Sequence, residues 1–551
     1  MAQLMTAWDY LPHVQIQDWK RDGFWADCLI SDRLDQHARD APEQIAFVDS
    51  RQAISYSQLQ ELTWRIAVGL QDRGLKRGDV VAIQLPNWIE FPALYVALVR
   101  LGAVASLIPP MCRENEVAMM LKLSNAKWYV CADSFKSFNF EAMAQSLQRQ
   151  SAFKALKVLC VSHEMGIESS WEQALNAVAV TQQAIEGFKK SQPSPDDLTE
   201  IVFTSGTTGE PKGVMHTHNT VMAPQIAMAR SLEIGQGSVL HMASTLAHQT
   251  GFLNGIQLTL QIGACTVLQD VWNTSDFFKL VEKYHIEVSS GSSTYLLDMV
   301  RSNELTAYDL SSFRIFRAGG GPIPIAVVNE SEEKIKNLTV LRGWGQTENG
   351  VVTLSRLSDP AEVRASLDGV AQAGMQIRVV GDDGVEVPND QEGLLQARGP
   401  FMCIGYINHP NLLNESIKDG WFNTGDLASQ NKAGYLKITG RLKDVIIRGG
   451  EKIPVSYVEN ILFEDERILE VALVGQPDER LGERVCAFVL CRPNQILTLA
   501  EMKAYLMNKG VAKPYWPEFL EIVENFPRTS NGKIQKAKLK NSLYRTDSKR
   551  H

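Results

Sequence analysis

The stretch from Thr204 to Gly213, TSGTTGEPKG, combines three glycines, four hydroxyl side chains and a single lysine, Lys212. Glycines let the backbone approach a ligand closely, and successive N–H groups in such a loop can converge on an anion. The β-branched run LTEIVF before it predicts a strand. The pattern is not the P-loop signature G-x-x-x-x-G-K-[ST]. A strand, a glycine-rich loop and one lysine favour a phosphate site, and these residues alone leave a flexible surface turn equally open.

Two later stretches could complete a nucleotide site. The run FRIFRAGGGPIP ends in residues 319–322, where a flat ligand could approach the backbone, with a plain turn as the equal alternative. The run LRGWGQTENG offers Trp344 to stack on a base, with glycines on both sides, followed by the hydroxyl of Thr347 and the carboxylate of Glu348. One carboxylate beside bound phosphates is the usual way to hold Mg²⁺, although a lone Glu is more commonly a solvated loop residue.

Two charged groups near the C-terminus also follow glycines. In DGWFNTGD, Asp426 ends a predicted strand, where its carboxylate could accept hydrogen bonds from two ribose hydroxyls. Arg441 ends the next strand pair in GYLKITGRLKD, so a simple salt bridge between the two is the alternative. In PRTSNGKIQK, Lys533 follows a flexible turn and by itself would be interpreted as a solvated tail lysine.

The elements that must position these residues alternate between strands and helices. DVVAIQL predicts a strand, WIEFPALYVALVRLG a helix with Asn87 as a candidate cap, and AVASLI the next, parallel strand. Residues from about 355 to 440 predict a small β-rich module, with a turn at DDG between two strands and then a third strand. Beyond it we expect a smaller α/β region with a helix near 456–464, strands EVALVG and VCAFVL, and a helix after Thr498.

Composition excludes several classes of function. The chain has 551 residues and a formal net charge of -8, which predicts more than one domain and disfavours nucleic acid or an anionic membrane as a partner. The longest apolar run is broken by an arginine, a glycine and prolines, and the N-terminus has no secretory signal pattern. The eight cysteines show no CxxC pair and predict reduced core thiols, so we expect a cytoplasmic protein. No motif specifies an oligomeric state.

Taken together, TSGTTGEPKG, GWGQTE, GWFNTGD, GRLKD, RGGEKI and PRTSNGK occur in the order and spacing of the adenylate-forming (ANL) superfamily. The chain resembles bacterial acyl-CoA synthetases of the short- or medium-chain fatty acid and cyclohexanecarboxylate type, from about residue 30 to 540. The resemblance implies an α/β fold. It implies a large N-terminal AMP-binding domain of βα units with parallel sheets (1–441) that contains the β-rich module, and a small, mobile C-terminal domain (442–551) with a hinge at Lys443.

The resemblance also implies roles for individual residues. Lys533 would bridge the substrate carboxylate and the α-phosphate, Glu348 would bind Mg²⁺, and Asp426 with Arg441 would hold the ribose. The expected catalytic residues are Lys533, Glu348, Thr204 and His248. The expected ATP-binding residues are Thr204, Ser205, Gly206, Thr207, Thr208, Gly209, Lys212, Gly320, Gly321, Pro322, Gly343, Trp344, Gly345, Gln346, Thr347, Asp426, Ile438, Arg441 and Lys533.

The stretch MASTLAHQTGF matches the part of the family that opens the acyl pocket. His248 stands where a histidine gates the thiol tunnel in related enzymes, with a hydrogen-bonded structural histidine as the alternative. Ala243 and Thr245 replace prolines of the relatives, and Gln249 replaces the acidic residue that pairs with an amino-acid substrate. The expected acyl- and CoA-binding residues are His248, Gln249, Phe252, Gly291, Gly319, Gly449, Gly450 and Glu451.

The implied activity has two steps. ATP and a carboxylic acid give acyl-AMP and pyrophosphate, and CoA then accepts the acyl group while AMP leaves, with ATP, Mg²⁺ and CoA as the required small molecules. An uncharged pocket favours a medium-chain or alicyclic acid. A stand-alone adenylation enzyme that loads an aryl or acyl acid onto a carrier protein is the alternative. A non-catalytic nucleotide-binding protein is a third reading, against which the intact Lys533, Glu348, Asp426 and Arg441 speak.

Overall fold

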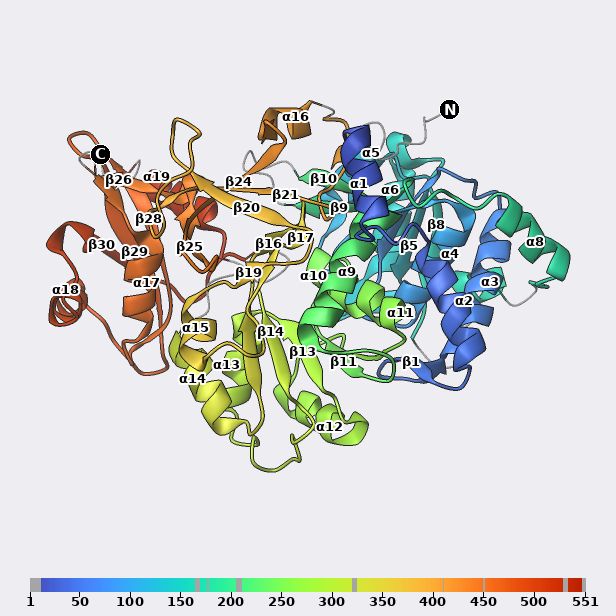
Figure 1. The fold of residues 1–551 in the computed structure, drawn as a ribbon, viewed down its shortest axis with the longest axis horizontal. Helices are drawn as coiled ribbons and strands as arrows, with labels where there is room; N and C mark the ends of the chain where they lie inside the picture. The colour runs from blue at the N-terminus through green and yellow to red at the C-terminus, as the bar shows by residue number, and fades with distance from the viewer. Residues whose placement is uncertain are drawn as a thin grey trace.

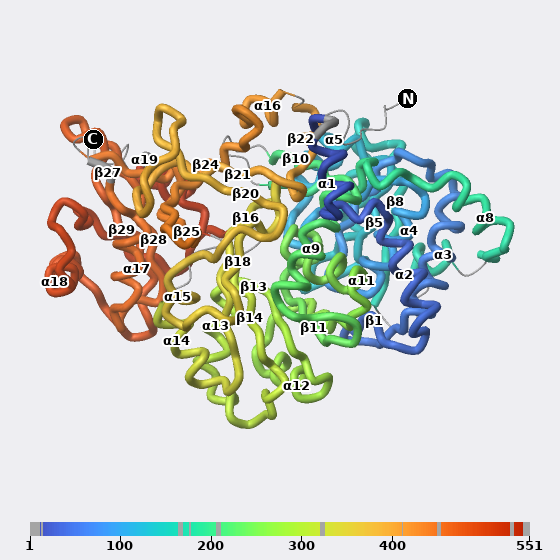
Figure 2. Tube along the Cα trace, viewed as in Figure 1, coloured from blue at the N-terminus to red at the C-terminus, as the bar shows by residue number. Residues whose placement is uncertain are grey.

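The structure, a computed structural model, describes residues 11–163, 169–175, 178–204, 211–319, 325–409, 411–448, 451–528 and 534–547. Figure 1 shows the N-terminal part of the chain at one end of the molecule and the C-terminal part at the other, with a β-rich region between them. The tube in Figure 2 follows the same path along the chain.

The first sheet has seven strands, and its core is parallel. Its strands are short apolar runs that are buried on both faces, as is typical of parallel sheets. Only β10 and β22 at one edge are antiparallel to their neighbours. In order across the sheet the strands are β22 (Gly405–Tyr406), β10 (Lys212–Thr217), β9 (Leu198–Thr204), β4 (Val104–Leu107), β3 (Val80–Gln84), β5 (Trp128–Ala132) and β8 (Lys157–Val161).

The predicted βαβ unit is present, since β3 and β4 pair in parallel and helix α4 (Glu90–Leu101) connects them. Every residue of α4 from Phe91 to Leu101 is buried, which explains why the helix is apolar on all sides. The prediction that Asn87 caps this helix is wrong, because α4 begins at Glu90 and Ile89 occupies the N-cap position. Asn87 instead lies in the loop between β3 and α4.

The second sheet also has seven strands, all parallel except the edge strand β2. Its apolar core includes Phe277, Phe278 and Phe313 and contacts Phe463 from the C-terminal part of the chain. The strands run in the order β15 (Thr339–Arg342), β14 (Ile315–Ala318), β13 (Val288–Gly291), β11 (Val239–Met242), β12 (Cys265–Leu268), β1 (Ile45–Val48) and β2 (Ala53–Ser55).

The expected β-rich module is an antiparallel sheet that crosses the top of the view in Figure 1. The segment after the DDG turn was expected to be a strand, but it forms only an isolated bridge between Val380 and Glu386. The sheet consists of β20 (Gln376–Val380), β21 (Gly393–Arg398), β24 (Trp421–Gln430), β23 (Ile417–Lys418) and β25 (Leu436–Arg441).

The C-terminal region has its own sheet and its own apolar core. Helix α18 (Leu499–Asn508) begins where predicted, because the Thr498 hydroxyl caps it and Glu501 completes a capping box. The sheet contains β27 (Glu451–Ile453), β26 (Ile446–Arg448), β29 (Gly482–Cys491), β28 (Ile468–Asp478) and β30 (Phe519–Ile522), packed with α17 (Val455–Phe463) and α19 (Lys536–Asp547). The predicted α/β class, with a large N-terminal and a smaller C-terminal part, is confirmed.

The remaining helices cover the two large sheets and connect their strands. They are α1 (His13–Arg21), α2 (Ile30–Asp40), α3 (Tyr56–Asp72), α5 (Glu114–Ser124), α6 (Phe140–Arg149), α7 (Ser170–Leu175), α8 (Gln182–Lys190), α9 (His218–Leu232), α10 (Gln249–Gly251), a π-helix (Phe252–Gln257), α11 (Leu258–Ile262), α12 (Thr274–Tyr284), α13 (Ser293–Arg301), α14 (Ile325–Lys334), α15 (Ala361–Ser366) and α16 (Leu412–Ser416).

Candidate active site

The glycine-rich stretch joins two antiparallel strands at the edge of the first sheet. β9 ends at Thr204, which lies opposite Lys212, the first residue of β10. The Lys212 ammonium lies 5.8 Å from the ring centroid of Tyr406, a residue of the neighbouring strand β22. Ser205, Gly206, Thr207, Thr208 and Gly209, which we expected to bind phosphates, lie outside the described residues.

The GWGQTENG stretch forms a tight hairpin of β16 (Gly345–Gln346) and β17 (Gly350–Val351). A Cβ atom on Gly345 would lie 1.8 Å from the carbonyl oxygen of Gly350, so the hairpin itself requires glycine there. The expectation that the glycines at 343 and 345 leave room for a base therefore has a competing structural explanation. The Trp344 ring is only 7% exposed, and its indole N–H donates to Asp426 Oδ2 at 2.7 Å.

Asp426 collects three of the predicted nucleotide-binding residues around one buried carboxylate. Strands β24 and β25 place it opposite Arg441, whose Nε lies 3.0 Å from Asp426 Oδ1. Oδ2 accepts hydrogen bonds from Trp344 and, at 2.9 Å, from the amide of Gln346. Ile438 lies farther along β25, and its N–H donates to Asp368 instead. The expected Asp426–Arg441 pair is thus present, and its contact with ribose stays a prediction.

Glu348 lies in the turn of the hairpin between β16 and β17 and is fixed from two sides. Its Oε1 accepts a hydrogen bond from the Tyr406 hydroxyl at 3.0 Å, and its backbone carbonyl accepts one from Cys403 N–H at 2.7 Å. Burial raises the pKa of the Glu348 carboxyl, while the Tyr406 hydrogen bond and the positive charges of Arg441 and Lys212 oppose that rise. A carboxylate oxygen suits Mg²⁺ that arrives with phosphate oxygens as further ligands, and the two nearby cations suit the phosphates themselves.

His216 links the glycine-rich hairpin to Thr347, a role that no motif indicated. Its Nε2 lies 2.8 Å from the carbonyl oxygen of Thr347, and its Nδ1 lies 3.1 Å from the Thr220 hydroxyl. A carbonyl can only accept, so Nε2 carries the proton and Thr220 donates to Nδ1. Burial lowers the pKa of His216 to about 4, so the imidazole is neutral at physiological pH. A buried histidine on an otherwise apolar strand was the available signal.

Of the two C-terminal lysines with predicted roles, the hinge residue Lys443 and the adenylation residue Lys533, the structure describes only Lys443. Lys443 is in a short 3-10 turn, Leu442–Asp444, that directly follows β25. Burial and the charge of Arg441 lower the pKa of Lys443, and Asp426 and Lys212 are also close enough to act on it. Lys443 therefore belongs to the same charged cluster as the predicted ribose pair. Lys533 lies outside the described residues, and the hinge role of Lys443 stays a prediction.

The predicted acyl-pocket residues begin helix α10. His248 occupies the N-cap position, where its Nδ1 accepts a hydrogen bond from Thr250 N–H at 3.3 Å. This contact gives the histidine a structural role, and its role as a gate stays a prediction. Gln249 is 4% exposed, and neither amide atom has a partner among the described residues. Phe252 is fully buried and packs edge-to-face on Tyr95, with ring centroids 4.7 Å apart.

Two glycines predicted to line the pocket do meet. Gly291 ends β13 and Gly319 follows β14, and the Gly319 N–H donates to the Gly291 carbonyl at 3.0 Å. Glu451 begins strand β27 in the C-terminal sheet. The other expected residues of this region, Gly320, Gly321, Pro322, Gly449 and Gly450, lie outside the described residues.

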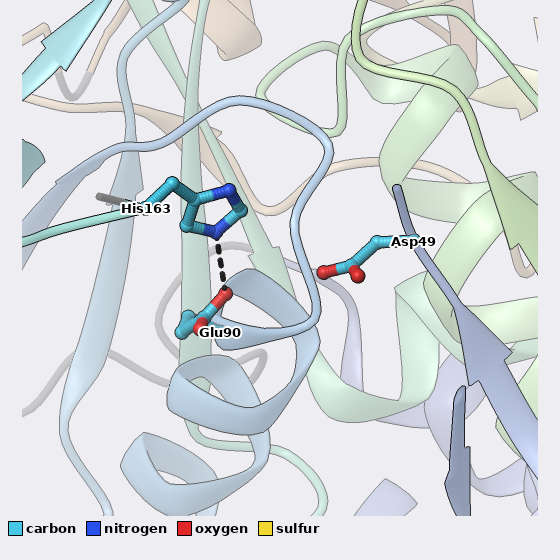
Figure 3. A group of neighbouring side chains, drawn as sticks. All are labelled: Asp49, Glu90 and His163. Atoms are coloured by element: carbon cyan, nitrogen blue, oxygen red, sulfur yellow. Dashed lines mark hydrogen bonds and ion pairs between the residues drawn. The ribbon is translucent and has the colours of Figure 1, made fainter. Parts of the chain in front are cut away.

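A second acidic cluster lies elsewhere, at the start of α4. Asp49, Glu90 and His163 each offer one potential metal-ligand atom, and these atoms lie within 4.8 Å of one another. Figure 3 shows His163 directed at Glu90, with the Asp49 carboxylate facing both. His163 Nε2 lies 3.4 Å from Glu90 Oε2, and the Arg51 guanidinium binds Glu90 Oε1.

The carboxylate oxygens of Asp49 and Glu90 already accept hydrogen bonds from protein groups. Asp49 Oδ1 accepts the N–H groups of Arg51 at 2.9 Å and Gln52 at 3.0 Å, and Oδ2 accepts the N–H of Ile89 at 3.1 Å. Against the effect of burial, His163 and Arg51 hold the pKa of Glu90 below its usual value. The cluster therefore resembles a structural brace more than a metal centre.

Comparison with known proteins fits the geometry of the first cluster. A family model described as AMP-binding enzyme matches residues 34–407, and one described as AMP-binding enzyme C-terminal domain matches residues 457–533. The chain belongs to the AMP-binding enzyme family. This membership confirms the resemblance to the adenylate-forming superfamily that the ordered motifs indicated, and it implies the use of ATP.

Relatives of this AMP-binding enzyme match it along nearly its whole length. A medium-chain fatty-acid–CoA ligase of Escherichia coli is 35% identical over 96% of this chain and 92% of its own. A 2,3-dihydroxybenzoate-AMP ligase of Bacillus subtilis is 28% identical over 98% of both chains. The ATP-bound crystal structure of MatB from Rhodopseudomonas palustris superposes with a TM-score of 0.83 at 25% identity, covering 94% of this chain and 99% of that one.

These matches confirm the expected enzyme class, an AMP-forming acid–thiol ligase. All eight cysteines lie within the described ranges as free thiols, of which four are buried as core residues and four are partly exposed. Among the helices that the structure describes, none combines the length and the apolar composition needed to cross a membrane.

Proposed function

We propose that this AMP-binding enzyme activates a medium-chain or alicyclic carboxylic acid as acyl-AMP and transfers the acyl group to CoA. The observation that carries the proposal is the cluster around Asp426 and Glu348. It gathers three cations, Lys212, Arg441 and Lys443, among the carboxylates of Asp426, Glu348 and Asp444. Cations and a carboxylate in one cluster suit a triphosphate that binds with a divalent cation. The similarity to a medium-chain fatty-acid–CoA ligase over nearly the full chain supports the acid class and the acceptor.

In the first step, a carboxylate oxygen of the acid attacks the α-phosphorus of ATP. The new O–P bond forms as the bond to the β-phosphate breaks, and pyrophosphate leaves. Lys212 would hold the departing phosphates, and Asp426 with Arg441 would fix the ribose. Lys533 would stabilise the charge that develops on the α-phosphate oxygens. Magnesium bound at Glu348 would neutralise phosphate charge. The Tyr406 hydroxyl and the Cys403 N–H keep the Glu348 carboxylate and its backbone in place.

In the second step, the CoA thiolate attacks the acyl carbon, the C–S bond forms, and the C–O bond to AMP breaks. The thiol proton passes to solvent. The sequence resemblance implies that the C-terminal domain, from residue 442 onward, rotates between the two steps about Lys443. Lys443 directly follows Arg441 and Leu442, so rotation there would exchange the groups facing the adenylate while the ribose pair stays in place. Gly449, Gly450 and Glu451 would then approach the thiol path.

Pyrophosphate release, measured with ATP, Mg²⁺ and CoA across a panel of acids, tests the proposal. The panel spans acetate to palmitate, benzoates, cyclohexanecarboxylate and several amino acids. Turnover that requires CoA and peaks on C6–C10 or alicyclic acids is the expected result. Saturation by a long-chain acid at a lower concentration than by any of these would overturn the acid class.

A second candidate is a stand-alone adenylation enzyme that loads a carrier protein. The similarity to a 2,3-dihydroxybenzoate-AMP ligase over 98% of both chains favours it specifically. Pyrophosphate release that does not depend on CoA and peaks on an aryl acid would select this function. Both candidates are compatible with the predicted cytoplasmic location. The first needs only small-molecule partners, whereas the second also needs a carrier protein.

The division of work between the two steps can be tested with Lys533→Ala. We expect this variant to lose acyl-AMP formation and to retain most of the thioester formation from supplied acyl-AMP, because Lys533 would serve only the first step. Separate assays of the two half-reactions measure this. Equal loss of both half-reactions would contradict the proposal that Lys533 serves only the first step.

A further inference from the structure

We propose that Asn87 is a positioning residue for the acid-binding side of the site. It fixes the backbone of residues 242–246, which lead into His248 and Gln249, and it thereby controls which acids are accepted. This inference rests on the proposed function. The family resemblance gave Asn87 no role, and the sequence suggested only a helix cap.

The contacts of Asn87 reach two places far along the chain, residues 242–246 and Gln269. Its side-chain amide is 3% exposed and donates from Nδ2 to the carbonyls of Ser244 at 3.0 Å and Gln269 at 3.1 Å, with Met242 O at 3.4 Å. Its Oδ1 accepts the N–H of Leu246 at 2.9 Å. One side chain of the first-sheet region thus holds the ends of β11 and β12 in the second sheet. Only an amide supplies both the donors and the acceptor that these four contacts need.

The segment held by Asn87 passes any displacement on to helix α10. Ala243 and Thr245 leave it without proline, so its backbone is not restricted locally. A Cβ atom on Gly251 would lie 2.1 Å from the carbonyl oxygen of Thr245, which shows how closely the segment and the helix pack. A shift of the Thr245 peptide must therefore move α10, and with it His248 and Gln249 at the start of that helix.

The loop that carries Asn87 is itself held on both sides by the cluster in Figure 3. Asp49 accepts the N–H of Ile89 at 3.1 Å. The Trp88 ring stacks on His163 with centroids 3.3 Å apart, and its indole N–H donates to Asp270 at 3.2 Å. Asn87 therefore lies on a rigid loop. The brace at the start of α4 supports the acid-binding side of the site through this loop.

The experiment compares Asn87→Asp with a matched control, Gln84→Glu. Gln84 is also fully buried and donates to two carbonyls, those of Pro109 and Cys112 at 3.0 Å each, but it holds a different segment. Both changes place a carboxyl oxygen against carbonyl oxygens. We expect Asn87→Asp to raise the KM for the acid about tenfold and to change the preference among acid chain lengths, with the KM for ATP altered no more than about twofold. Gln84→Glu should leave the acid preference as in the wild type.

If the acidic variants do not fold, Asn87→Ala and Gln84→Ala replace them in the experiment. Hydrogen exchange of the amides in residues 242–250 of the full chain gives a readout that needs no substrate. We expect faster exchange there in Asn87→Ala, and no change there in Gln84→Ala. Wild-type acid KM and acid preference in the Asn87 variants, or equal changes in the Gln84 variants, would overturn the inference. If the wild type turned over no acid, the proposed function would fail. Unchanged hydrogen exchange of residues 242–250 in Asn87→Ala would separately overturn the role of Asn87 in holding this segment.

Discussion

Two acidic clusters in this enzyme are made of the same kinds of side chain and differ in what occupies their oxygens. Around Asp49 and Glu90, backbone N–H groups, the Arg51 guanidinium and His163 already engage the carboxylates. Around Asp426 and Glu348, the first carboxylate binds Arg441 on one oxygen and Trp344 with Gln346 on the other. The second is held by Tyr406 on one oxygen and lies near Arg441 and Lys212.

The difference teaches how to distinguish a structural carboxylate from one available for a ligand. At the start of α4 the groups balance and the cluster fixes a loop. Near the GWGQTE hairpin, three cations, Lys212, Arg441 and Lys443, lie among the carboxylates of Glu348, Asp426 and Asp444. The Arg441 side chain is still 44% exposed, so a phosphate ligand can reach it. The proximity of acidic residues, which both clusters share, does not separate the two functions.

The largest effect should come from replacing a glutamate carboxylate by an amide in each of the two clusters. We expect Glu348→Gln to lower the rate of acyl-AMP formation by about 10²-fold or more, because the carboxylate that would hold Mg²⁺ is lost. Glu90→Gln, the matched control, should leave that rate within about threefold at saturating acid, since its carboxylate pairs with Arg51 and His163 and would hold no Mg²⁺. Pyrophosphate release measures both. Similar rates for the two variants would break the comparison.

A smaller effect is expected within the site cluster itself. Asp426→Asn should raise the KM for ATP by about tenfold, because Arg441 loses its charged partner and the ribose loses an acceptor. The KM for the acid should stay near the wild-type value, since the contacts of Asp426 are with Trp344, Gln346 and Arg441. Initial rates at varied ATP and varied acid separate the two constants. A rise confined to the acid KM would place Asp426 on the other side of the site.

The pH dependence of stability sharpens the description of the brace. The pKa of Glu90 is held below 4.5 by His163 and Arg51, so its ionised form stabilises the folded state above that pH. Glu90→Gln should therefore lower the free energy of unfolding by about 1–2 kcal/mol at pH 7. The difference should disappear as the pH falls below 4.5 through the folded-state pKa. Urea unfolding at several pH values tests this, and a loss that did not vary with pH would contradict it.

Glu200, on the strand that leads into the glycine-rich stretch, should have the opposite effect on how stability depends on pH. It is fully buried, neither carboxyl oxygen has a partner among the described residues, and burial raises its pKa well above 4.5. Its contribution to stability is therefore present at low pH and is lost as the pH rises. Glu200→Gln should stabilise the protein at neutral pH by about 1 kcal/mol, with no gain below pH 4.5. The same unfolding series measures it, and destabilisation at pH 7 would count against it.

Much of the local structure could be predicted because its signals lie within a few residues. The βαβ unit from β3 to β4 and the capped helix after Thr498 follow from apolar periodicity and capping residues. The errors also have local causes. Asn87 has the composition of a cap, yet its amide is taken by a distant segment, and the residues after the DDG turn form a single bridge instead of a strand.

The sequence by itself determined the family and the set of candidate residues, because the ordered motifs specify the chemistry without a structure. The tertiary structure decided which of these residues meet. Trp344 and Asp426 are 82 residues apart, His216 and Thr347 are 131 apart, and Asn87 and Ser244 are 157 apart. Local periodicity carries no information about contacts at such separations, because they depend on which strands pair and how the sheets pack. Tyr406 holds Glu348 for this reason, and no motif names it.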